Sequence, residues 1–310
     1  MIKYILHRTL MLIPVIIGVA FLVFFIISLT PGDPVRLILG DEAAADPVAV
    51  YNLRRELGLD QPLVIQFIMY LGRLVQGDFG TSFFGNRPVF DEVMRALPHT
   101  IELTFWSVLF GLIMAIPLGV FAAMRQYSLM DNISMIVTLV GAAIPNFWFG
   151  LLLMLLFALH LEWLPSFGTG TFRHMILPAI TLGTTNAAII ARMTRSSMLE
   201  VIRQDYIRTA KSKGVSGRKI ITKHAFRNAS IPIVTIIGLQ FGGLLGGAVL
   251  TETVFSIPGL GTLMVRAIQQ LDTPMVLGSI IIFTILFSIV NLLVDILYAF
   301  IDPRIKADYK

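Results

Sequence analysis

The side chains that most often do chemistry are scattered in this sequence. The chain has no cysteine, which excludes disulfides, thiolate metal sites and cysteine nucleophiles. Hydroxyl pairs such as Ser196-Ser197 have no neighbouring base at the spacing of an activated nucleophile. None of the five histidines stands at metal-ligand spacing to another: His7, His99, His160, His174 and His224. The sequence therefore predicts no catalytic site, no metal site and no cofactor bound by this chain.

A nucleotide-binding loop is also missing from the sequence. There is no GxxxxGK[ST] motif, and the G-x-G triplets at Gly168–Gly170 and Gly259–Gly261 lack the strand and helix that such a loop needs. The formal net charge of +5 comes from one loop beside apolar runs, so it does not indicate a nucleic-acid partner. A chain without its own energy source that carries such a loop suggests a motor supplied by other subunits.

That loop is the segment Arg192–Asn228, which lies between two long apolar runs. It contains two acids, Glu200 and Asp205, against ten basic residues: Arg192, Arg195, Arg203, Arg208, Lys211, Lys213, Arg218, Lys219, Lys223 and Arg227. Short loops rich in lysine and arginine stay on the cytoplasmic side of a membrane. The segment therefore sets the predicted orientation of the whole chain.

The same segment has helical spacing. Leu199, Ile202, Tyr206 and Ala210 recur every three or four residues, which predicts one face of a helix that Gly214 would end. A second short helix is predicted over Gly217–Arg227. Two short amphipathic helices separated by a glycine are typical of a docking surface. The alternative is a solvated basic loop that only sets topology and touches anionic lipid.

The elements that position this segment are membrane spans. The chain of 310 residues is 56% hydrophobic and 14% charged, with mean hydropathy +0.81, far from the roughly 25% charged residues of soluble domains. Crossing a bilayer takes about 20 apolar residues. Six runs qualify: Thr9–Gly32, Leu103–Met124, Asn132–Leu159, Met175–Ala191, Ala229–Thr251 and Pro274–Val294. The sequence predicts an all-α polytopic membrane protein with both termini cytoplasmic.

Three regions follow from this pattern. They are an N-terminal tail with the first span (1–32), an extracytoplasmic segment (33–98), and a core of five spans (99–310) that contains the loop 192–228. The extracytoplasmic segment holds nine acids and six arginines. Helical periodicity appears in it at Val48–Leu57 and Leu63–Leu74. We expect it to cover the outer mouth of the bundle.

Small residues and a proline mark two of the spans. The fifth span has glycines four apart at Gly238, Gly242 and Gly246, with Gly243 and Gly247 beside them. Such spacing lets helix backbones approach closely and also leaves a lumen free of side chains, and both roles are expected. In the third span, Pro145 and Asn146 interrupt the run and predict a bend.

Charge is absent inside all six runs. Ion-coupled transporters usually keep an ionisable residue in the membrane, so stand-alone secondary transport is disfavoured. It stays an alternative because backbone carbonyls can bind sodium. A second alternative is a membrane receptor or anchor whose loop binds a soluble partner without moving solute.

The sequence resembles the inner-membrane permease subunits of binding-protein-dependent ABC importers, in the dipeptide/oligopeptide group, which also carries glutathione and nickel chelates. The resemblance runs from end to end. Its segments are PGDP (31–34), GDFGTS (77–82), AIPNFWFG (143–150), ARMTRSSMLEVIRQDYIRTAKSKG (191–214), HAFRNASIP (224–232), FSIPGLG (255–261) and NLLVDILYAFIDPRI (291–305). Of the general importer signature, Glu-Ala-Ala-x3-Gly-x9-Ile-x-Leu-Pro, only Ala210 and Gly214 are matched. The other positions follow the peptide-group variant.

The resemblance implies the partners and the site. The chain would pair with a homologous second permease in a bacterial or archaeal inner membrane, and an extracytoplasmic binding protein would deliver di- or oligopeptides. Two ATPase subunits would hold ATP and Mg²⁺ and dock on the cytoplasmic loop. The residues implied for this docking are Asp205, Tyr206, Arg208, Thr209, Ala210, Gly214, Lys219, Lys223, His224, Arg227 and Asn228. The chain itself would be a non-catalytic subunit.

Overall fold

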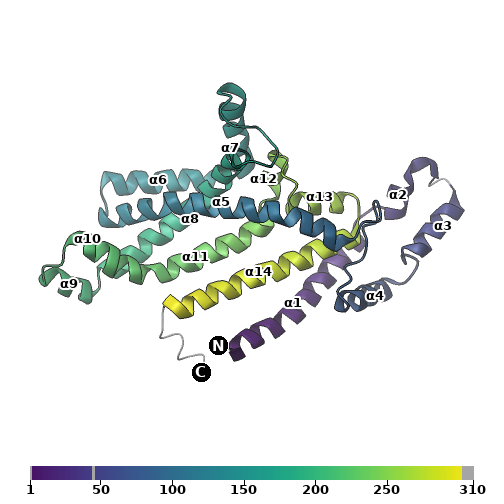
Figure 1. The fold of residues 1–310 in the computed structure, drawn as a ribbon, viewed down its shortest axis with the longest axis horizontal. Helices are drawn as coiled ribbons and strands as arrows, with labels where there is room; N and C mark the ends of the chain where they lie inside the picture. Colours follow the sequence, from purple (N-terminus) through teal and green to yellow (C-terminus); the bar gives the residue numbers. More distant parts are fainter. Residues whose placement is uncertain (1, 44–45, 302–310) are drawn as a thin grey trace. The chain divides into compact units, whose positions relative to one another are not determined.

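The computed structural model describes residues 2–43 and 46–301, which form helices joined by short turns (Figure 1). Within these ranges the only β pairing is an isolated bridge between Thr81 and Pro88. In the described part of the chain, five helices are long and apolar enough to cross a membrane, and a bent pair makes a sixth if it counts as one span. The predicted all-α polytopic fold is therefore confirmed, while the orientation of the termini stays a prediction.

The helices are named in chain order, with two π-helical stretches called η1 and η2. They are α1 (Ile2–Leu29), α2 (Pro34–Ala43), α3 (Pro47–Glu56), α4 (Leu63–Val75), α5 (Val89–Met124), α6 (Leu129–Ala143), α7 (Asn146–Leu153), η1 (Met154–His160), α8 (Phe172–Ile202), α9 (Asp205–Ser212), α10 (Gly217–Lys219), η2 (Ile220–Ala225), α11 (Phe226–Gly247), α12 (Val249–Val254), α13 (Leu260–Gln269) and α14 (Thr273–Ile301).

The chain divides into two compact units. One is formed mainly by Ile101–Ile257, and α8 lies at its centre against α6, α7 and α11. Helix α5 approaches α8 so closely that a Cβ on Gly119 would lie 2.6 Å from the carbonyl oxygen of Ala191. This position therefore requires glycine, and the two backbones pack as small residues in membrane helices allow.

The other unit is formed mainly by Ile5–Thr100 and Pro258–Ser288. One of its cores joins α1, α4 and α14 through Ala20, Phe24, Tyr70, Leu277 and Ile281. Its loops are fixed by the buried carboxylate of Asp272. Burial raises the pKa of Asp272, and hydrogen bonds to its carboxylate oppose that rise. The donors are the Ser82 hydroxyl and the backbone N–H groups of Phe83 and Met275.

Segment 33–98, predicted to be extracytoplasmic, contains both predicted helices, now seen as α3 and α4. Asp46 caps α3, since its side chain accepts from the Val48 N–H at 2.9 Å. The sequence did not reveal α2, nor that α5 already begins at Val89. Helix α5 continues past Pro98 because Val93, Ala96 and Leu97 are buried along its first turns, which stabilises the helix before the apolar run starts.

Two predicted boundaries around segment 192–228 were wrong. The fourth span was expected to end at Ala191, but α8 continues to Ile202, because Thr194, Ser197 and Met198 keep one face of the helix buried. The single helix expected through Leu199 and Ala210 is broken, since Gln204 is extended (φ −70°, ψ 149°) and separates α8 from α9.

The second predicted short helix is present but is not separate from the fifth span. The backbone is helical without interruption from Gly217 through α10, η2 and α11 to Gly247. Ile220 and Ala225 are buried, so packing begins well before Ala229. The fifth span was predicted to start at Ala229 because the basic residues end just before it. A movement of α10 is therefore passed directly to α11.

The predicted bend in the third span is a sharp break. Helix α6 ends at Ala143, and the following helix leaves at 99° after Ile144 and Pro145. Ile144 is extended, as expected for a residue that precedes proline. The Thr185 hydroxyl of α8 donates to the Asn146 side-chain oxygen, which holds the start of α7 against α8.

Candidate functional site

The clearest candidate site is the outward side of residues 205–227, which comprise α9, α10, η2 and the first residues of α11, and we call it the basic surface. Its seven basic side chains are all exposed: Arg208, Lys211, Lys213, Arg218, Lys219, Lys223 and Arg227. Within this surface the one acidic residue is Asp205, which is 97% exposed and lies 3.6 Å from Arg208. A cluster of like charges of this kind favours an acidic partner surface.

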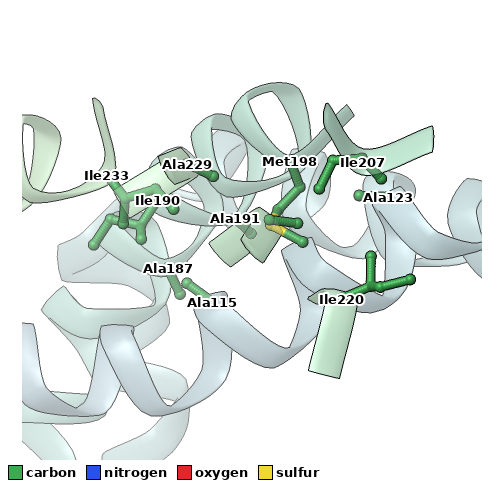
Figure 2. Packing of buried hydrophobic residues seen from close by; sticks show 11 residues of the cluster. Ala115, Ala123, Ala187, Ile190, Ala191, Met198, Ile207, Ile220, Ala229 and Ile233 are labelled. Carbon is green, nitrogen blue, oxygen red and sulfur yellow. The ribbon is translucent and has the colours of Figure 1, made fainter. Parts of the chain in front are cut away.

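The opposite side of the same helices is apolar and buried. Ile207, Ile220 and Ala225 are 0–4% exposed and belong to one cluster with Met198 of α8 and Ile233 of α11 (Figure 2). Burying an isoleucine or methionine side chain is worth about 1.5–3 kcal/mol. The basic surface is therefore fixed to α8 and α11, so force on it is transmitted to both spans.

The turn between α9 and α10 depends on Gly214. This residue has φ +75°, a left-handed conformation that side chains with a Cβ disfavour. The Val215 N–H donates to the Ala210 carbonyl at 3.2 Å, and the Gly214 N–H donates to that of Lys211 at 3.0 Å. This is the Schellman pattern of a helix C-terminus, and it confirms that Gly214 follows the end of a helix.

A side-chain contact links the two halves of the basic surface. The Asn228 amide donates to the Tyr206 hydroxyl at 2.9 Å and to the His224 carbonyl at 2.9 Å. Tyr206 is 43% exposed, so this bond lies at the rim of the surface. It joins the start of α9 to the start of α11.

The structure thus brings all eleven predicted docking residues into one region. Nine are exposed, while Ala210 and His224 are half-buried. Their predicted role in binding ATPase subunits stays a prediction.

One polar pair behind this surface was missed by the sequence analysis. Asp131 of α6 is 2% exposed and accepts two bonds from the Arg195 guanidinium of α8, both at 2.7 Å. The Tyr127 N–H donates to the same carboxylate at 2.9 Å. The available signal was Ser128, which caps α6 three residues before Asp131. A Ser-x-x-Asp pattern before an apolar run marks a helix start.

The sequence analysis looked only for charged residues inside the spans, but two amide side chains also form contacts there. Gln240 of α11 donates to the Asn186 side-chain oxygen of α8 at 2.6 Å. Asn186 is 5% exposed and also donates to the Leu182 carbonyl at 2.9 Å. Together with the contact between Thr185 and Asn146, these polar groups connect α7, α8 and α11 at membrane depth.

The glycines of the fifth span differ in their surroundings. A Cβ on Gly238 would lie 2.0 Å from a Val294 methyl group, whereas nothing lies within 4 Å of a Cβ on Gly243. Gly242 is buried and Gly243 exposed. The surroundings of Gly246 and Gly247 lie outside the part of the structure that is described. A role of these glycines in the pathway stays a prediction.

Comparison with known proteins places these features in a family. Residues 115–307 match the family described as "Binding-protein-dependent transport system inner membrane component", and residues 1–104 match the corresponding N-terminal family. The dipeptide transport system permease protein DppB of Alkalihalophilus pseudofirmus is 44% identical, covering 99% of this chain and 100% of that protein. The glutathione transport system permease protein GsiC of Escherichia coli K12 is also 44% identical, covering 99% of each.

Solved structures agree on the fold. A chain of the inward-facing MetNI methionine ABC transporter superposes with a TM-score of 0.57 at 20% identity, covering 68% of this chain and 96% of that one. A chain of an amino acid ABC transporter gives 0.52 at 14% identity, covering 67% and 94%. The chain belongs to the family of inner-membrane permease components of binding-protein-dependent ABC importers.

Proposed function

We propose that this chain forms half of the translocation pathway of a short-peptide importer and that its basic surface receives the movement of cytoplasmic ATPase subunits. The observation that carries the proposal is the two-sided packing of α9 and η2. Their charged side is exposed, while Ile207, Ile220 and Ala225 are packed with side chains of α8 and α11. A partner that pushes on the charged side therefore moves two spans.

The substrate class rests on the relatives. Permeases named for dipeptides and for glutathione are each 44% identical to this chain over its full length. Both ligands are short peptides, so short peptides are the substrate class we propose. Since the six apolar runs contain no charged residue, the pathway would recognise peptides by their backbone and shape and would not select a charge.

The proposed assembly contains four kinds of partner. They are a homologous second permease, two ATPase subunits that bind ATP and Mg²⁺, an extracytoplasmic peptide-binding protein, and the lipid of a bacterial or archaeal inner membrane. Both termini and the basic surface would face the cytoplasm, in line with the distribution of lysine and arginine. In this assembly the chain is non-catalytic. Closing of the ATPase pair would move the packed helices between two arrangements as rigid bodies.

The experiment is purification of the tagged full-length chain from its native membrane in mild detergent. We expect a second permease and ATPase subunits to co-purify, and ATP hydrolysis to rise when binding protein and a dipeptide are added. Reconstituted vesicles should then accumulate the peptide only with ATP. Uptake by the chain alone under an ion gradient would instead support a secondary transporter. Partner binding without any peptide-stimulated hydrolysis would support a receptor or anchor.

A further inference from the structure

Helix α4 has an exposed apolar side that the proposed function does not explain. It is 13 residues long, too short to cross a bilayer, which takes about 20 residues. Val64 is 69% exposed, Ile68 60% and Val75 89%. Since α4 belongs to the segment predicted to lie outside the membrane, such exposure requires an explanation.

The three sides of α4 are chemically distinct. With 3.6 residues per turn, Phe67, Tyr70 and Leu74 share one side, and all three pack into the core with α1. Gln66 and Arg73 share a second, polar side. Val64, Ile68 and Val75 share a third side, roughly opposite the polar one.

The packed side fixes the depth of α4 along the first span. The Phe67 ring lies 5.5 Å from the rings of Phe21 and Phe24, centroid to centroid. Both partners lie inside the span Leu10–Leu29, of which only 11% is buried by protein. At 1.5 Å per residue, Phe24 and Phe21 lie about 8 and 12 Å from the Leu29 end. Phe67 is therefore level with apolar residues of a span that this chain leaves largely uncovered.

The exposed apolar side of α4 lies beside exposed apolar residues of α1. Phe21 contacts Phe67 and is itself 50% exposed, and its neighbour Leu22 is 59% exposed. In contrast, the polar side of α4 lines a pocket of about 460 Å³ at the Leu29 end of the span. Its polar wall includes Gln66, Arg73, Ser28, Thr30 and Asp33.

We propose that α4 is an interfacial helix, inserted into the leaflet at the Leu29 end of α1, with Val64, Ile68 and Val75 in contact with acyl chains. Gln66 and Arg73 then face the headgroups and water. Helices with one polar and one strongly apolar side lie in this way in the plane of a membrane, with the apolar side about 5–10 Å below the headgroups. The first span and α4 together form the lipid-facing edge of their unit.

Because the native chain has no cysteine, a single introduced cysteine is the one position in this chain that a thiol-reactive label modifies. Single-cysteine variants of the full chain, purified with any co-purifying subunits, carry a nitroxide label in vesicles of neutral phospholipid. Collision of the label with oxygen, which concentrates in the acyl region, is compared with collision with a water-soluble nickel chelate. Ile68→Cys is the test position. Leu22→Cys on α1 is the lipid control, and Asn52→Cys, on the exposed side of α3, is the aqueous control.

The expected result is that the label at 68 has an oxygen-to-nickel collision ratio equal to that at 22 and several-fold above that at 52. In a scan of 63–75, the ratio should peak at 64, 68 and 75 and fall at 66 and 73. A label at 68 that collides with the nickel chelate as at 52 would overturn the proposal, because α4 would then lie in water. A label at 68 protected from both reagents would overturn it as well, since protein would cover this side.

Discussion

Helices α9 and α4 are both too short to span a membrane, and both are held by one buried side, yet their exposed sides are opposite in character. Ile207 is fully buried beneath α9, and Tyr70 is 4% exposed beneath α4. Around them, α9 exposes Arg208 and Lys211, whereas α4 exposes Val64 and Ile68. The buried side determines where each helix is attached. The exposed side determines its surroundings, which we propose to be an acidic ATPase surface for α9 and acyl chains for α4.

The largest effect is expected from a charged residue placed on the buried side of α9. Ile207→Asp would bury a carboxylate without a partner, which costs several kcal/mol, at least about 3. We expect little intact chain in the membrane and a large loss of thermal stability of what is purified. The matched variant Arg208→Asp, on the exposed side, should leave the amount and stability of the chain unchanged while weakening ATPase binding. Equal effects of the two variants would contradict the assigned sides.

The two ion pairs near the basic surface provide a second contrast. Asp131→Asn leaves the Arg195 guanidinium, 23% exposed, without its carboxylate, and we expect a loss of about 2–3 kcal/mol. The readout is thermal unfolding of the purified chain in detergent. Asp205→Asn, in an exposed pair, should not change the unfolding temperature. An unchanged Asp131→Asn protein would show that the pair between α6 and α8 does not stabilise the fold.

Gly214 tests whether the turn of the basic surface matters for coupling. Gly214→Val forces a β-branched residue into a left-handed conformation, at a cost of about 1–2 kcal/mol. No atom lies within 4 Å of its Cβ position, so the effect is one of backbone conformation and not of a clash. We expect ATP hydrolysis that no longer responds to peptide. Gly217→Ala, at a glycine that also has open space around it but ordinary φ, should behave as wild type. Full peptide uptake per ATP in the valine variant would contradict the role of this turn.

The smallest effect is expected when a charged residue is placed on the exposed side of α4 and an apolar residue on the exposed side of α9. Ile68→Lys on α4 should cost about 1 kcal/mol, because the long side chain can reach the headgroups. Lys211→Ile on α9 should leave thermal stability unchanged. A stability gain from Ile68→Lys would indicate that this side of α4 is in water.

The sequence predicted those features that depend on residue type and local spacing. The apolar runs gave the spans, and Gly214 marked a helix end because its conformation favours glycine. Boundaries were predicted less well. Charge suggested that the fourth span ends at Ala191, but helix α8 needs only one packed face to continue to Ile202.

Contacts between distant residues could not be predicted from one sequence. Asp131 and Arg195 are 64 positions apart, and Arg195 looked like one more solvated residue of a basic loop. The surroundings of α4 were hidden for a similar reason. Its helical pattern was visible, but its depth beside α1 depends on the contact of Phe67 with Phe21 and Phe24, which no local pattern specifies.

We propose that cytoplasmic ATPase subunits bind the basic surface, and crosslinking from this surface is a direct test of that binding. A single cysteine at Lys219, introduced into the naturally cysteine-free chain and carrying a short photo-crosslinker, would be activated in native membranes. We expect a covalent product with an ATPase subunit, whose yield changes when ATP is bound, and no such product from the same crosslinker at Asn52. A Lys219 crosslinker that captures only lipid, with the assembly still active, would contradict the account and leave the basic surface as a determinant of topology alone.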